Sequence, residues 1–298
     1  MNKLQCVITL VVAILFGGAG SVVLAKALPE SGDTKEAQRV YEKGAALTMD
    51  DLPRSRIQQS LRALQSPARE RALQWLNSFT FNERDLDSLN LDRDGGVFYT
   101  DKAPAKTKNE VLRHDGFSYV DDTIDVFRLH SKPGSENVLY IDFDGHEIRG
   151  TAWNRTGRTL YQAMPFNLDG DGKQFSGAEK ANIHEIWRQI AKDFVGYDVD
   201  VTTEQPEFFG KTTGHVIITR HIDAHGEPMP YHQTSGVAYV GVWGRYDFAY
   251  YSPALVYYDN MPRYAQHIAD AAAIKLKRAL WHRLPSGQTP RQFSSKNV

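Results

Sequence analysis

The stretch 175–203, "FSGAEKANIHEIWRQIAKDFVGYDVDVTT", combines a well-signalled helix with a strand and decides the fold class. Ser176 and Glu179 have the spacing of a capping box, which marks the start of a helix. Apolar side chains then recur at helical spacing, at Ile183, Ile186, Trp187, Ile190 and Phe194. The segment "YDVDVTT" at 197–203 follows this helix and predicts a strand.

A second strand precedes the helix, because "NVLYIDFD" at 137–144 is apolar and rich in β-branched and aromatic residues. Strand, long helix and strand in this order predict a crossover connection and a mainly parallel sheet. Further strands are predicted at 95–101, 215–220, 235–241 and 253–259. We therefore expect an α+β fold with a twisted, mainly parallel sheet and long helices.

Two helices are predicted upstream of the sheet. They lie in "LPRSRIQQSLRALQ" and "SPARERALQWLNSF", and the second has an apolar stripe that includes Trp75 and Leu76. These helices predict a small helical subdomain, and the polar, Lys-rich stretch after it reads as a linker. We place this helical region and its linker at 28–116, the main domain at 117–272 and an aberrant or truncated C-terminal segment at 273–298.

The first residues have the form of a secretory signal peptide. Lys3 precedes an apolar run, and small residues and Ala25-Lys26-Ala27 follow it. We predict a signal peptide at 1–27 and a secreted or periplasmic protein with no membrane contact after cleavage, although an uncleaved run could anchor the chain. The only cysteine, Cys6, would leave with the signal. Lys and Arg total 35 against 36 for Asp and Glu, which disfavours a nucleic-acid partner.

The loop "NLDGDG" spaces oxygen-bearing side chains as calcium-binding loops do. Asn167, Asp169 and Asp171 alternate before Gly172. A full EF-hand loop would need an acidic residue at 178, where the chain has Ala178. A calcium site and a solvated turn before a helix therefore both remain open.

Two other groups of polar residues could carry chemistry. Asp142 and Asp144 follow one strand, and such a carboxylate pair binds metal, acts as an acid–base pair, or simply faces solvent at the strand end. His146-Glu147 next to them is not a zinc motif, because the fourth residue after His146 is Gly150. A histidine-rich loop places His221, His225 and His232 near Gly and Pro residues, so an exposed loop and a zinc site both remain open.

Several blocks of the chain resemble successive blocks of bacterial secreted, metzincin-like zinc metallopeptidases. They are "LYIDFDGHEIRGTAWN", "FSGAEKANIHEIWRQIAKDFVGYDVDVTTEQP", "SGVAYVGVWG" and "IADAA", and the resemblance covers about residues 50–272. The helical region with "RALQWLNSF" and "GGVFYTD" resembles the segment that precedes the catalytic domain. The resemblance implies a metzincin-like upper subdomain, a pro-segment-like region before it, a zinc cofactor and hydrolysis of peptide bonds by zinc-activated water.

The zinc motif of that family is missing from this chain. In the family, a block like "IADAA" leads into the helix H-E-x-x-H-x-x-G-x-x-H, whose histidines bind zinc and whose glutamate is the general base. Carried across residue by residue, the ligand positions hold Ile274, Arg278 and Leu284, the base position holds Lys275, and the glycine position holds Trp281. None of these side chains can replace the residue that the motif requires.

We therefore expect a protein of this peptidase family that has lost its catalytic apparatus. A natural pseudoenzyme, a truncated gene product and a reading-frame shift after Ala272 all explain the loss. The alternative function is a noncatalytic module that binds peptides or proteins. In metzincins an edge strand pairs with the extended substrate, and the resemblance assigns this strand to Gly236, Val237, Ala238, Tyr239 and Val240. Backbone pairing of this kind needs an open edge and no particular side chains.

Overall fold

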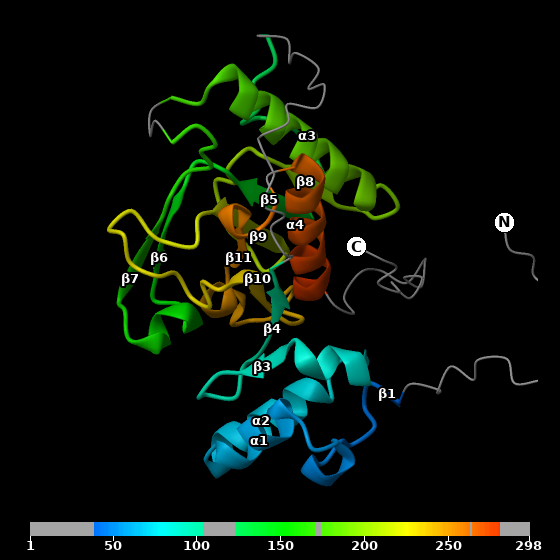
Figure 1. The fold of residues 1–298 in the computed structure, drawn as a ribbon. Coiled ribbons are helices and arrows are strands. Elements are labelled where there is room, and N and C mark those ends of the chain that lie inside the picture. Colours follow the sequence, from blue (N-terminus) through cyan, green and yellow to red (C-terminus); the bar gives the residue numbers. More distant parts are fainter. Residues whose placement is uncertain (1–38, 104–122, 171–173, 263, 281–298) are drawn as a thin grey trace, which may run out of the picture. The chain divides into compact units, whose positions relative to one another are not determined.

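A seven-stranded sheet lies at the centre of the fold, in the order β3-β4-β10-β11-β9-β5-β8 (Figure 1). Its strands are β3 Leu89–Leu91, β4 Val97–Lys102, β5 Val138–Asp142, β8 Asp200–Thr202, β9 Thr213–Thr219, β10 Thr234–Tyr239 and β11 Ala254–Tyr257. The computed structural model describes residues 39–103, 123–170, 174–262 and 264–280. The predicted signal peptide and most of the C-terminal segment lie outside these residues. Among the described helices, none has the length and apolar character needed to cross a bilayer.

The sheet is mixed. Strands β11, β9, β5 and β8 run parallel to one another, whereas β10 is antiparallel to β11 and to β4, and β4 is antiparallel to β3. Strand β4 therefore points the same way as the parallel group. The expected α+β class and a mostly parallel central sheet are confirmed, and all six strands predicted from the sequence are present.

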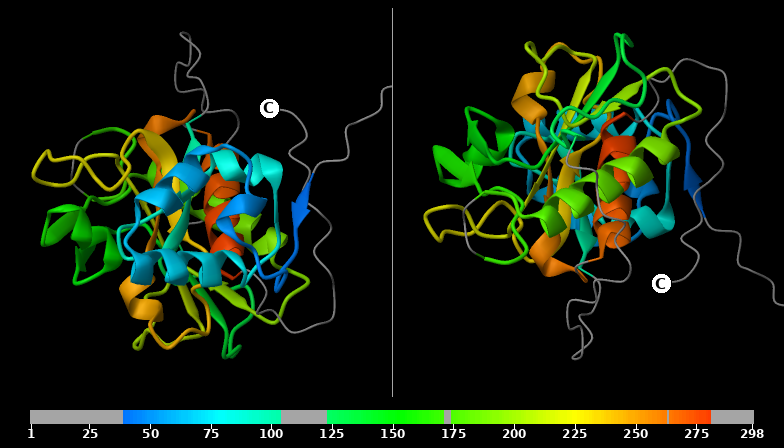
Figure 2. Two further views of the ribbon diagram at one scale, coloured as in Figure 1. Left: turned by 90° about the horizontal axis from the view of Figure 1, so that it is seen from below. Right: turned by 90° about the horizontal axis from the view of Figure 1, so that it is seen from above.

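Two long helices cover one face of the sheet (Figure 2). They are α3 Gly177–Asp193 and α4 Ala265–Ala279, which pack against each other. Helix α3 begins as the sequence predicts, because the Ser176 Oγ accepts a hydrogen bond from the Glu179 N–H and the Glu179 carboxylate accepts one from the Ser176 N–H. Apolar side chains of both helices form one core with the sheet residues on this face.

The opposite face is covered by a hairpin and by the N-terminal helices. Strands β6 His146–Arg149 and β7 Leu160–Ala163 pair as an antiparallel hairpin. Helices α1 Arg56–Ala63 and α2 Ser66–Leu76 confirm the two helices predicted upstream, and they share a second apolar core with the hairpin and the sheet. The remaining elements of the described residues are the paired strands β1 Val40–Tyr41 and β2 Phe81–Asn82 and five short 3₁₀ helices, at 49–51, 83–87, 152–156, 248–251 and 258–260.

The sheet contains strands from both sides of the predicted linker, which ends at residue 116. Strand β4 lies on the N-terminal side of that linker and pairs with β10 along its whole length, from Tyr239 opposite Phe98 to Thr234 opposite Lys102. The Trp75 indole N–H also donates to the Val240 carbonyl at 2.9 Å. The described part of the region before the linker thus shares a sheet and an apolar core with the main domain.

The prediction that 235–241 forms an open edge strand is wrong. Strand β10 lies between β4 and β11, and its backbone is paired on both sides. The sequence block does not reveal this, because β4 is more than one hundred residues away along the chain. A peptide cannot add to β10 while β4 remains in place.

Candidate functional site

Helix α4 continues through the position where the family resemblance ends. Its buried face runs without a break past Ala272, along Ile268, Ala269, Ala272, Ala273, Leu276 and then Leu280 at the C-cap. These side chains recur every three or four residues and pack against α3 and the sheet. Ala279-Leu280 therefore ends a regular amphipathic helix.

Two of the zinc-motif positions on α4 hold cations that bind one aspartate. The Lys275 ammonium donates to the Asp101 carboxylate, and Arg278 Nη1 donates to both Asp101 oxygens at 2.6 Å. The guanidinium also lies over the ring of Tyr99, with its carbon 3.9 Å from the ring centroid. Asp101 and Tyr99 belong to β4, so this cluster joins strand β4 to helix α4. We call Asp101, Lys275 and Arg278 the β4–α4 ion cluster.

The local backbone makes room for this cluster. Lys275 is completely buried, and it passes over Gly236 of β10. A Cβ atom at Gly236 would lie 2.3 Å from the Leu255 carbonyl oxygen and 3.0 Å from the Lys275 Cε. Glycine is therefore required here for close packing of strand and helix.

The charges of the β4–α4 ion cluster shift one another's pKa. Burial alone would raise the pKa of Asp101, but the charges and hydrogen bonds of Lys275 and Arg278 lower it to about 2. Burial lowers the pKa of Lys275 to about 8, although the Asp101 charge opposes this change. Asp101 is thus a carboxylate and the cluster carries an excess of positive charge at neutral pH, which repels a metal cation from these positions.

The other zinc-motif positions offer no metal ligand. Ile274 has no donor atom and is 43% exposed on the outer side of α4. Leu284 and Trp281 lie outside the described residues. The proposed loss of zinc from this helix therefore rests on Ile274 and on the β4–α4 ion cluster.

The predicted calcium ligands are described only in part. The Asn167 Oδ1 accepts a hydrogen bond from the Gly170 N–H at 2.5 Å, and the Glu179 carboxylate accepts one from the Leu168 N–H at 2.6 Å. These bonds fix the turn before α3. Asp171 lies outside the described residues, so calcium binding by Asn167, Asp169 and Asp171 stays a prediction.

Asp142, singled out from the sequence, meets two histidines. Its Oδ2 lies 3.0 Å from His215 Nε2 and 3.3 Å from His146 Nδ1. Asp142 ends β5, His215 lies on the neighbouring strand β9, and His146 starts the β6–β7 hairpin. We call these three residues the Asp–His cluster. Sequence reasoning missed His215, because a single histidine inside an apolar strand has no spacing signal.

Buried charge dominates the electrostatics of the Asp–His cluster. Burial would raise the pKa of Asp142, but the hydrogen bonds and charges of His146 and His215 hold it well below its usual range. Burial lowers the pKa of His215, against the pull of Asp142. Partial burial and the nearby Asp142 carboxylate raise the pKa of Asp144 to about 6. The two carboxyl groups predicted as a pair therefore do interact.

The three loop histidines do not converge. The His221 imidazole binds Asp259, with Nδ1 2.7 Å from Oδ2, whereas the exposed His225 lies 3.7 Å from Asp223. Asp223 is instead held by Arg158 at 2.7 Å. Among the described residues, only the Asp–His cluster brings three ligand atoms of histidine and carboxylate within 4.8 Å of one another.

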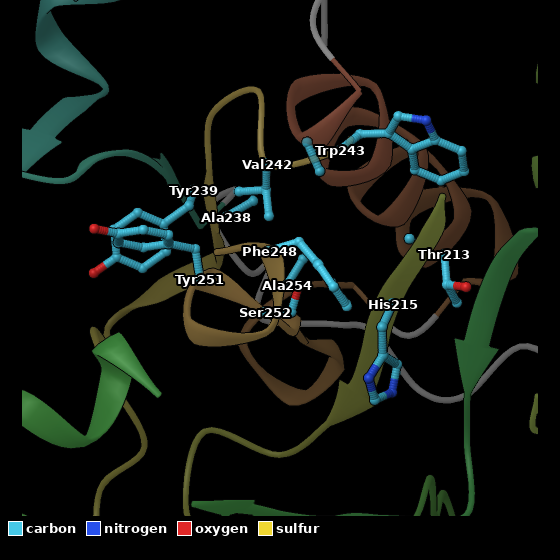
Figure 3. Close-up of a pocket in the computed structure, with 12 residues that line it drawn as sticks. Thr213, His215, Ala238, Tyr239, Val242, Trp243, Phe248, Tyr251, Ser252 and Ala254 are labelled. Carbon is cyan, nitrogen blue, oxygen red and sulfur yellow. The ribbon is translucent and has the colours of Figure 1, made fainter. Parts of the chain in front are cut away.

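His215 also borders a small hollow on the sheet. Figure 3 shows its ring extending from β9, while Phe248, Val242 and Trp243 line the space above it. Tyr239 and Tyr251 lie together at the far end, with ring centroids 4.8 Å apart. The lining is mainly apolar and aromatic, so the hollow offers few polar groups with which to orient a ligand.

Comparison of this chain with protein-family models, with curated proteins and with solved structures finds no match.

Proposed function

We propose that this protein is an exported relative of the metzincin-like zinc metallopeptidases that does not cleave peptides itself. The β4–α4 ion cluster carries this proposal. Two positions that the resemblance assigns to a zinc ligand and to the general base hold Arg278 and Lys275, and both side chains bind Asp101. Zinc-activated water and a carboxylate base are thus both missing from α4.

The packing of α4 supports a natural pseudoenzyme over a reading-frame shift. The buried face continues through Leu276 and Leu280, and the cations of Lys275 and Arg278 both reach one carboxylate. A segment read in the wrong frame has no reason to preserve an apolar face and to match a buried charge. The α4 residues after Ala272 therefore match the apolar core and the buried charge formed by the earlier part of the chain.

Recognition without cleavage is the activity that remains to such a chain. Peptide or protein partners would have to contact surfaces other than β10, because β4 occupies the strand position that the resemblance assigns to substrate. Zinc at the α4 positions has no part in this role.

The test is a cleavage assay on the full mature chain. Denatured proteins and a mixed peptide library would be incubated with the chelated protein and with the zinc-supplemented protein, and new N-termini would be identified by mass spectrometry. We expect no cleavage in either case, while an active zinc peptidase cleaves the same mixture. Zinc-dependent cleavage that co-purifies with the chain and disappears in the Lys275→Ala variant would overturn the proposal.

A further inference from the structure

We propose that the Asp–His cluster is a binding site for a divalent transition ion of the zinc class, away from the α4 positions. The site consists of Asp142, His146 and His215, with Asp144 beside them. It does not depend on the function proposed above.

The spacing of the ligand atoms fits a tetrahedral ion. Zinc binds histidine nitrogen and carboxylate oxygen at about 2.0–2.2 Å, so neighbouring ligands of a tetrahedral site stand about 3.3 Å apart. In this cluster Asp142 Oδ2 lies 3.0 Å from His215 Nε2 and 3.3 Å from His146 Nδ1. All three ligand atoms lie within 4.8 Å of one another, so an ion contacts all three once the side chains move to tetrahedral spacing.

One oxygen of the Asp142 carboxylate lacks a hydrogen-bond donor among the described residues. Its side chain is 1% exposed, and no hydrogen-bond donor in the described part of the chain reaches its Oδ1. A buried carboxylate oxygen without a partner is costly. The neighbouring Asp144 adds a second carboxyl group, which increases the negative charge at this point. A divalent cation would offset both charges.

The surrounding structure holds the ligands in place. The His215 ring packs against Tyr140 and Phe209, with centroid distances of 5.1 and 5.0 Å, which fixes its orientation. The turn at Gly145, with φ of 92°, brings His146 back over Asp142. A Cβ atom at Gly145 would lie 2.8 Å from the Ala163 carbonyl oxygen, so the turn depends on glycine.

The site is open on one side. The His146 side chain is 31% exposed, and Asp144 is exposed at the surface. An ion can therefore enter past these two residues while Asp142 and His215 remain buried. Asp144 is the candidate for a fourth ligand.

The ligand types select the class of ion. Two imidazoles with carboxylate oxygen suit zinc, cobalt, nickel or copper. Calcium prefers six to eight oxygen ligands, which this cluster does not provide. Zinc and cobalt are therefore the ions to test, and calcium is the control.

The full mature chain would be freed of metal with a chelator and titrated with zinc by calorimetry and with cobalt by visible absorption. We expect one zinc ion per chain, a cobalt spectrum of a four-coordinate site and a higher Tm with zinc. His146→Ala should weaken zinc binding about tenfold or more, because it removes a ligand from a half-exposed position. His225→Ala, at an exposed loop histidine, should bind zinc like the wild type.

Asp142→Asn serves as the second variant, since asparagine keeps the shape of the side chain while losing its charge. Weakened zinc binding by this variant, with an unchanged circular dichroism spectrum, supports the site. Absence of zinc binding by the wild type, or equal binding by His146→Ala and the wild type, overturns it. Calcium raising the Tm where zinc does not would also overturn it and would point to the loop at Asn167.

Discussion

At the scale of single residues, Asp101 is the counter-charge of two cations of helix α4. It compensates Lys275, which is completely buried, and Arg278, whose side chain is 14% exposed. Buried ion pairs add little net stability, but removing one partner strands the other charge in a poorly solvated place. Asp101 is therefore a residue whose loss the fold cannot easily absorb.

Asp101→Asn should lower the free energy of unfolding by about 3 kcal/mol, because Lys275 then loses its counter-charge. Asp193→Asn is the matched control. Asp193 of α3 binds Lys277, which lies on α4 like Lys275, in an exposed ion pair at 2.6 Å. The control should cost less than about 1 kcal/mol. Urea unfolding of both variants at pH 7 measures the difference, and equal losses would contradict the assigned role of Asp101.

At the scale of secondary-structure elements, β8 is the last strand of the sheet, and the segment around His130 lies along its outer edge. His130 bridges to Thr202, and Ser131 N–H donates to the Val201 carbonyl. The imidazole lies between two carboxylates, with Nδ1 2.7 Å from Asp200 and Nε2 2.8 Å from Glu204. Arg128 also binds Glu204, at 2.7 Å. The contact of this segment with β8 therefore depends on the protonation of His130.

We expect the contacts of His130 with Asp200 and Glu204 to stabilise the fold less as pH rises. Burial opposes protonation of His130, but the hydrogen bonds and charges of Asp200 and Glu204 outweigh it and raise the pKa above 6.5. Because the folded pKa exceeds the unfolded one, the added stability is complete below pH 6.5 and is lost as pH rises through the folded pKa. An NMR titration of the imidazole checks this, and Asp200→Asn should lower the pKa. An unchanged His130 pKa in that variant would contradict the role assigned to Asp200.

The elements differ in how well the sequence predicts them. Helix α3 follows from local signals, since Ser176 and Glu179 cap it and its apolar stripe is regular. The pairing of β4 with β10 does not, because strand partners are set by packing between segments far apart in the chain. The Asp–His cluster has the same limitation. Asp142 is visible as a carboxylate at a strand end, but only the sheet register places His215 beside it.

At the scale of the molecule, several long-range links join the described residues, and three of them involve strand β4, Trp75 and Asp101. Strand β4 pairs with β10, Trp75 donates to the Val240 carbonyl, and Asp101 binds two cations of α4. All three cross the linker predicted before residue 116. The helical region before this linker is therefore built into the same sheet and apolar core as the strands and helices after it.

These links predict that the two regions unfold together. Leu61→Ala, at a completely buried position of α1, should cost about 3 kcal/mol through loss of packing. Circular dichroism and tryptophan fluorescence, to which Trp75 before the linker and the four tryptophans after it all contribute, should then show one coincident transition at lower urea. Arg62→Ala, on the exposed side of the same helix, should leave the midpoint nearly unchanged. If Leu61→Ala instead separates the two probes, the N-terminal helices fold independently, and β4 is a detachable strand that could expose β10 to a peptide.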